Sequence, residues 1–327
     1  MKKKILISII LLTTLNVANA QFGYGKLEDV KNIKEAPLLV LLESKNKKTV
    51  KRLSKKDNGA LEQYYAQINQ YNDALKKAFT DSWEFTEEIK FIEEDSLDIY
   101  NTKDRKGKFS YFTKVVQKGD TDSSLLRLQG TITTHSYAIF LTGSNKPVHT
   151  LMYTAHTLNE ADAKFISQQI QNYLRKRLLT TEDKKSRTKL MQEMNNNAHE
   201  VREKIVLFDK DNLAPEIVNA ANMVYPFQHK VTSKEEIDKA ILNNEPDKVY
   251  LKILPVGQLS GVSRPVKTAK LMHVQYLIDA TNGEVKAFVS PSKIGLGGSL
   301  GTSMKTSKHQ MTQKDLEKMV KTINGIR

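Results

Sequence analysis

LLVLL at residues 38–42 is an unbroken apolar run between Pro37 and Glu43. A strand buried on both faces, inside a sheet covered by helices, shows such a run, whereas a half-exposed strand alternates apolar and polar residues. Residues 61–79 then repeat apolar side chains at steps of three and four, which is typical of an amphipathic helix. This order predicts a sheet covered by helices in the first half of the chain.

The rest of the first half continues the alternation and then changes to successive strands. Apolar patterning predicts strands near 89–92, 109–116, 125–134, 137–142 and 148–153, a short helix near 95–99, and a closing helix from Asn159. Helices between the early strands imply parallel crossovers, and the later strands form antiparallel hairpins. The order predicted for each unit is β-α-β-α-β-β-β-α with a mixed sheet, and the first half has one strand segment more than this order.

The second half repeats this order. IVLFD at residues 205–209 matches LVLLE at residues 39–43 in character, and the hairpin at 276–285 matches 139–148. Its Asn282-Gly283 pair predicts a tight turn, because both residues tolerate positive φ. Asn159 and Thr312 are expected to cap the two closing helices, which place Asp162 and Asp315 at matching positions.

We therefore predict an α/β fold of two tandem, duplicated α/β modules with mixed sheets flanked by helices. Two unrelated modules, or one larger domain, are the alternatives. The predicted organisation is a signal peptide at 1–20, an N-terminal lead at 21–37, a first module at 38–178, a polar linker at 179–200 and a second module at 201–327.

The N-terminus predicts export from the cytoplasm. Residues 2–4 are all lysine, residues 5–12 are apolar apart from Ser8, and Ala18-Asn19-Ala20 forms a small-x-small cleavage site before Gln21. We expect cleavage between Ala20 and Gln21 and a periplasmic or extracellular mature protein. A buried N-terminal strand or helix is the alternative interpretation.

The composition excludes some chemistry and favours one kind of partner. The chain has no Cys, which excludes disulfides, thiol catalysis and Cys-ligated metals. The sequence after residue 20 has no run of 18–20 apolar residues, so no transmembrane segment is predicted in the mature chain. Without the three lysines at 2–4, 48 Lys and Arg face 37 Asp and Glu, a net charge of +11. Such a charge favours anionic partners, with simple solubility as the alternative, and export argues against nucleic acid.

One segment concentrates that charge. Seven cations fall within twelve residues directly after the first strand, at the sheet edge where open α/β sheets commonly bind ligands. We interpret residues 44–56 as a basic loop and its cations as a candidate anion site, with a solvated charged loop as the alternative. The seven are Lys45, Lys47, Lys48, Lys51, Arg52, Lys55 and Lys56.

The glycine-rich segment 295–301 is a second anion candidate, because backbone N–H groups can approach a phosphate there and Lys305 and Lys308 add charge. A flexible surface loop is the alternative. Segments 45–58 and 292–308 are expected to be the most mobile parts of the mature chain.

Catalytic motifs are weak. Residues 297–301 fit G-x-S-x-G by letters, but they lack the strand-to-helix turn and the Ser-acid-His order of a hydrolase. His135, His149 and His156 share a strand-rich region and could approach one another, yet no metal-ligand spacing is present. We expect no metal and no cofactor, and no catalytic residue is assigned.

These observations predict an exported, non-enzymatic protein that binds an anionic ligand or supports an envelope assembly. The alternative is an extracytoplasmic enzyme of the hydrolase class whose site is assembled only in three dimensions.

Overall fold

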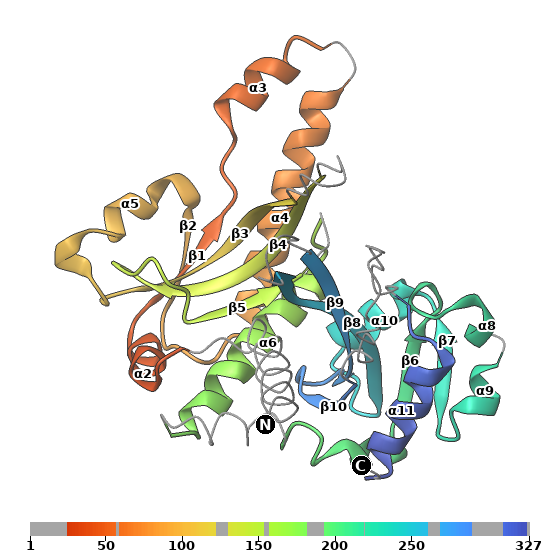
Figure 1. The fold of residues 1–327 in the computed structure, drawn as a ribbon. Helices are drawn as coiled ribbons and strands as arrows, with labels where there is room; N and C mark the ends of the chain where they lie inside the picture. Colours follow the sequence, from red (N-terminus) through yellow and green to blue (C-terminus); the bar gives the residue numbers. More distant parts are fainter. Residues whose placement is uncertain are drawn as a thin grey trace, which may run out of the picture.

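A computed structural model of the chain describes residues 25–56, 59–121, 130–153, 157–181, 193–218, 220–260, 269–289 and 310–325. Each half of the chain forms an α/β module around a mixed five-stranded sheet flanked by helices (Figure 1). The predicted fold class is therefore confirmed. The predicted signal peptide lies outside the described residues.

The first sheet has the order β2-β1-β3-β4-β5. Its strands are β1 (Leu38–Leu42), β2 (Ile89–Glu93), β3 (Ser110–Thr121), β4 (Gly130–Leu141) and β5 (His149–Met152). Strand β1 is parallel to β2 and β3, and the β3–β4 and β4–β5 pairs are antiparallel. All five residues of β1 are buried, as its unbroken apolar run predicts.

The helices predicted at 61–79, near 95–99 and from Asn159 are present, and two further helices lie in the predicted N-terminal lead and in the predicted basic loop. They are α2 (Leu27–Glu35), α3 (Lys47–Leu53), α4 (Ala60–Ser82), α5 (Leu97–Tyr100) and α6 (Glu160–Leu178), with short 3₁₀ helices η1 (Glu94–Ser96) and η2 (Lys103–Arg105). Among the described residues, no helix is both long enough and apolar enough to cross a bilayer.

The second sheet has the order β10-β9-β8-β6-β7. Its strands are β6 (Ile205–Asp209), β7 (His229–Thr232), β8 (Lys248–Ser260), β9 (Ala269–Asp279) and β10 (Val285–Val289). Taking β6 to β10 as equivalents of β1 to β5, the strand order and every parallel or antiparallel pairing agree. The agreement fits a duplication, whose occurrence stays a prediction.

Helices also surround the second sheet. They are α8 (Pro215–Val218), α9 (Ala221–Val224), α10 (Lys234–Leu242) and α11 (Gln313–Ile323), together with η3 (Ala198–Glu203) and η4 (Lys210–Asn212).

One predicted break in the first sheet is wrong. The apolar pattern predicts separate strands at residues 125–134 and 137–142, but β4 is continuous from Gly130 to Leu141. The polar residues His135 and Ser136 pair with Val116 and Met152 in the neighbouring strands. Ladder pairing on both sides keeps the backbone extended through this polar step.

Helix α6 joins the two modules. Thirteen of its nineteen residues are buried, because it packs against α4 and β5 of the first module and α10 of the second. Its Gln169 and Asn172 amides donate hydrogen bonds to Gly283 O (2.5 Å) and Asn282 O (3.0 Å) in the β9–β10 turn. A helix that is buried on almost every side belongs to the common core rather than to the surface of one module.

The predicted turn at Asn282-Gly283 is present, but only Gly283 is left-handed, with φ of 69°. Asp279 Oδ1 accepts from Thr281 N at 2.9 Å and Asp279 O accepts from Gly283 N at 2.9 Å, so a longer loop replaces the two-residue turn. A Cβ at Gly283 would lie 2.7 Å from the Cβ of Gln168 on α6.

We expect Gly283→Ala to lower the free energy of unfolding by about 2–3 kcal/mol, from left-handed strain and overpacking against α6. Gly107→Ala is the matched control, because Gly107 has φ of 72° but an added Cβ there would meet no other atom within 4 Å. It should lose only about 1 kcal/mol in urea denaturation. Equal losses in the two variants would contradict close packing of the turn on α6.

Candidate functional site

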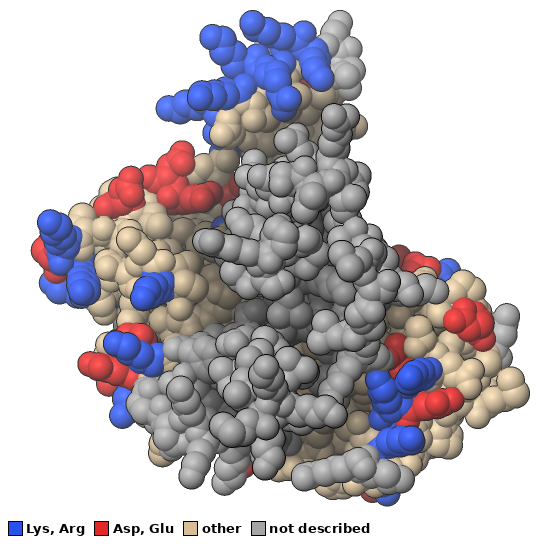
Figure 2. Space-filling model, viewed as in Figure 1, with Lys and Arg blue, Asp and Glu red and all other residues tan. Residues whose placement is uncertain are grey.

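Seven exposed cations gather on a part of the molecule that projects from the first sheet. We call residues 45–56 the cationic arm; it contains α3 and stands beside the N-terminal end of α4 (Figure 1). Figure 2 shows a continuous cluster of Lys and Arg side chains over this arm. All seven predicted cations are exposed, and none forms an ion pair with another described residue.

The prediction that residues 44–56 form a loop is wrong, because residues 47–53 form helix α3. Asn46 caps this helix by accepting a hydrogen bond from Thr49 N at 3.0 Å, and its own N–H donates to Tyr64 Oη on α4 at 2.9 Å. Lys45 lies 4.7 Å from the ring centroid of Tyr65. These contacts attach the arm to α4 and stabilise it, although it has few apolar side chains to bury.

Helix α3 places its charge on one face. Lys47, Lys48, Lys51 and Arg52 occupy positions i, i+1, i+4 and i+5, whereas Val50 and Leu53 are half-buried. The pairs Lys47–Lys51 and Lys48–Arg52 are like charges four residues apart, which destabilise a helix by about 0.2–0.5 kcal/mol each. An anionic partner would relieve this repulsion.

The base of the arm meets an acidic cluster of four exposed carboxylates. Ser44 Oγ donates to Glu93 Oε2 at 3.2 Å, and Asp95 N donates to Ser44 Oγ at 3.5 Å. Figure 2 shows acidic side chains directly below the arm. The charge of this face is therefore strongly asymmetric. The four residues are Glu93, Glu94, Asp95 and Asp98.

A second polar cluster lies buried between the modules. Tyr153 Oη donates a hydrogen bond to Asp162 Oδ1. Lys252 Nζ, on β8, lies 2.8 Å from Tyr153 Oη and 3.3 Å from Asp162 Oδ1. Lys234 of α10 lies 3.5 Å from Asp162 Oδ2 and 2.7 Å from Asp238 Oδ2. This network therefore ties α6 to β8 and α10.

Burial and charge oppose each other in this network. Burial raises the pKa of the Asp162 carboxyl, but the attraction of Lys252 and the hydrogen bond from Tyr153 outweigh it, so the net pKa is lowered. Burial lowers the pKa of Lys252, and the nearby Asp162 only partly restores it. The charged pair is therefore maintained by mutual contact, which suits a structural link between modules.

The closing helices use their matching aspartates differently. Both predicted caps are present, since Asn159 and Thr312 accept from the backbone N–H groups of Asp162 and Asp315. Asp315 Oδ2 in turn accepts a hydrogen bond from Thr312 N, which completes a capping box. Asp162 instead turns its carboxylate toward Tyr153 and Lys252.

Two of the three histidines that share the strand-rich region, His135 and His149, lie apart. His135 lies on β4 opposite Tyr153, whereas His149 pairs with Ile139, four residues further along that strand and about 13 Å away. The His149 ring stacks on Tyr173, with ring centroids 3.7 Å apart. No group of three or more described His, Asp or Glu residues could hold a metal ion.

Several predicted site residues lie outside the described residues. These are the cleavage residues Ala20 and Gln21, the glycine-rich segment 295–301, Lys305, Lys308 and His156. Comparison of the chain with protein-family models, with curated proteins and with solved structures gives no match.

Proposed function

We propose that this is an exported, non-enzymatic binding protein that attaches to an anionic phospholipid surface through its cationic arm. One observation carries the proposal: seven exposed cations without carboxylate partners among the described residues sit on a projecting, helical arm. Each Lys or Arg near an anionic membrane surface contributes about 1 kcal/mol of attraction.

The shape of the arm favours a broad surface over a small anion. The cations of α3 spread over one face of a helix and its exposed continuation, so their side chains diverge. A small anion could contact only a few of them, whereas an array of phosphate headgroups could meet most of them together.

The acidic cluster supports an oriented attachment. Glu93 is paired with Leu42 and accepts a hydrogen bond from Ser44 at the base of the arm, Glu94, Asp95 and Asp98 follow it in the chain, and the same surface would repel all four. Attraction at the tip and repulsion behind it would restrict contact to the arm and hold the body away from the headgroups.

A vesicle-binding experiment with the mature chain tests the proposal. The triple variant Lys47→Gln, Lys48→Gln and Lys51→Gln should bind phosphatidylglycerol vesicles about 100-fold more weakly, from the loss of about 3 kcal/mol of attraction. Glutamine is chosen because its helix propensity is close to that of lysine, so α3 is retained. Cosedimentation measures the fraction bound.

The matched control removes the same charge elsewhere, from exposed lysines on α2 and α11. Lys31→Gln, Lys314→Gln and Lys321→Gln should change binding by less than about threefold if only the arm meets the surface. Phosphatidylcholine vesicles should bind neither protein. If the two triple variants weaken vesicle binding equally, binding depends on the net charge of the protein and not on the cationic arm.

A further inference from the structure

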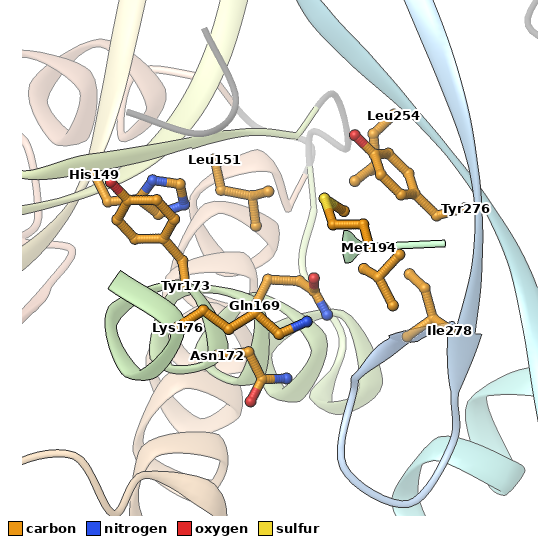
Figure 3. Close-up of a pocket in the computed structure, with 11 residues that line it drawn as sticks. His149, Leu151, Gln169, Asn172, Tyr173, Lys176, Met194, Leu254, Tyr276 and Ile278 are labelled. Atoms are coloured by element: carbon orange, nitrogen blue, oxygen red, sulfur yellow. The ribbon is translucent and has the colours of Figure 1, made fainter. Parts of the chain in front are cut away.

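A pocket lies between the two modules, between α6 and the strands of the second sheet. It is open to solvent on one side, and Figure 3 shows its lining side chains. Most of the lining surface is apolar, as is usual for small-molecule sites, which also carry a few placed polar groups. The apolar side chains are Leu151, Met194, Leu254, Tyr276, Ile278 and Val285.

Helix α6 supplies the polar wall. Gln169, Asn172, Tyr173 and Lys176 line the pocket at positions i, i+3, i+4 and i+7, which lie on one helix face. The amide nitrogens of Gln169 and Asn172 already donate to the β9–β10 turn. Lys176 is therefore the cationic group available to a ligand on this face.

Lys176 lacks the counter-ion that its neighbours have. Arg175 pairs with Glu84 at 2.8 Å, and Lys286 pairs with Glu200 and Glu284 at 2.7 Å each. Lys176 is half-buried and has no ion pair with any described residue. In Figure 3 its side chain runs from α6 toward the strands of the second module. Burial lowers the pKa of Lys176, which is the expected cost of a cation without a partner.

His149 is a second polar group without a partner. Its side chain lines the pocket, and the residue is only 3% exposed. Its Nδ1 atom makes no hydrogen bond with the described residues, although the ring stacks on Tyr173. Buried ring nitrogens normally have hydrogen-bond partners, so an unpaired one in a residue that lines the pocket is a candidate contact for a ligand.

We propose that this pocket binds an amphipathic monocarboxylate, with an aliphatic or aromatic body against the six apolar side chains. The carboxylate pairs with the Lys176 ammonium, and His149 is a second polar group of the lining. This site is separate from the cationic arm and does not depend on the membrane attachment proposed above.

Titration of the mature chain with dansyl-undecanoate, followed by dansyl fluorescence, tests the site. We expect saturable binding that decanoate displaces and decyltrimethylammonium does not, because Lys176 would repel the cation. Lys176→Gln should weaken the affinity about ten- to 100-fold, the usual effect of losing one charge-assisted hydrogen bond. His149→Phe should weaken it by a smaller factor.

Two control variants decide where the probe binds. Arg175→Gln removes an exposed cation one residue away and should leave the affinity unchanged. The arm variant with Gln at positions 47, 48 and 51 should also bind normally. Three results would each overturn the proposed site. The probe does not bind saturably, Lys176→Gln keeps the original affinity while its circular dichroism is native, or the arm variant loses binding.

Discussion

Asp162→Asn is expected to lower the free energy of unfolding by about 3–5 kcal/mol, the usual result of removing one partner of a buried ion pair. The Asp162 side chain is 6% exposed and that of Lys252 is 18% exposed, so water cannot fully replace the lost carboxylate. Lys252 would then lack this counter-charge beside the rings of Tyr153 and Phe165, 4.9 and 5.1 Å from Nζ. Urea denaturation measures the change.

An exposed pair provides the control for this loss. Lys77 and Asp81 form an ion pair at 3.0 Å whose side chains are 53% and 51% exposed, and Asp81→Asn should cost less than about 1 kcal/mol. Adding Lys252→Met to Asp162→Asn should recover part of the larger loss, because the unpaired buried charge is then gone. A cost for Asp162→Asn as small as that for Asp81→Asn would show that the network does not hold the modules together.

His149 is expected to make the protein unstable in acid. Burial lowers the pKa of its imidazole from 6.5 to about 3. Between pH 6.5 and 3, His149 is protonated in the unfolded state but neutral in the folded state. The free energy of unfolding therefore falls as the pH drops through this range. The slope for this group is about 1.4 kcal/mol per pH unit, so the loss is about 3 kcal/mol at pH 4.5 and on the order of 4 kcal/mol at pH 3.

The comparison variant is His149→Phe, which keeps an aromatic ring against Tyr173 and cannot titrate. Urea denaturation of the two proteins at pH 7.5 and 4.5 should show the original protein losing about 3 kcal/mol more than the variant. The other titrating groups cancel in this difference. His199→Asn, at an exposed position, should behave like the original protein. Parallel pH profiles for the original protein and His149→Phe would contradict the burial of a neutral His149.

Much of the fold can be predicted from the sequence, because its signals are local. The unbroken apolar run at residues 38–42 predicts burial on both faces, and the structure buries all five residues. The order of strands and helices within each half follows from the same periodicities. Asn159 and Thr312 can be assigned as caps because a cap depends only on the next three residues.

Helix α3 is hard to predict because its charge density is typical of a loop. The signals that indicate it are short: Asn46 before Thr49 as a cap, and Val50 and Leu53 three residues apart on the opposite face. Their stabilisation depends on Tyr64 and Tyr65 of α4, and sequence alone does not show that contact.

The buried network and the pocket could not be predicted, because their members meet only after the modules pack. Lys252 lies ninety residues from Asp162 along the chain. Asp162 and Asp315 look equivalent in sequence, yet Asp162 meets a tyrosine and a lysine from other elements, whereas Asp315 Oδ2 accepts a hydrogen bond from the N-cap of its own helix. The sequence groups His149 with two other histidines, but its stacking on Tyr173 depends on how α6 crosses β5.

The most direct test of the proposed membrane attachment places a label on the arm itself. The chain has no Cys, so Ser54→Cys, at the exposed end of α3, gives a single site for an environment-sensitive fluorophore. Gln313→Cys, exposed at the start of α11, gives the matched site away from the arm. With phosphatidylglycerol vesicles, we predict a blue shift at position 54 that is lost in 1 M salt, and no shift at position 313. A shift at position 313 without one at position 54, or no shift at either site, would contradict attachment through the cationic arm.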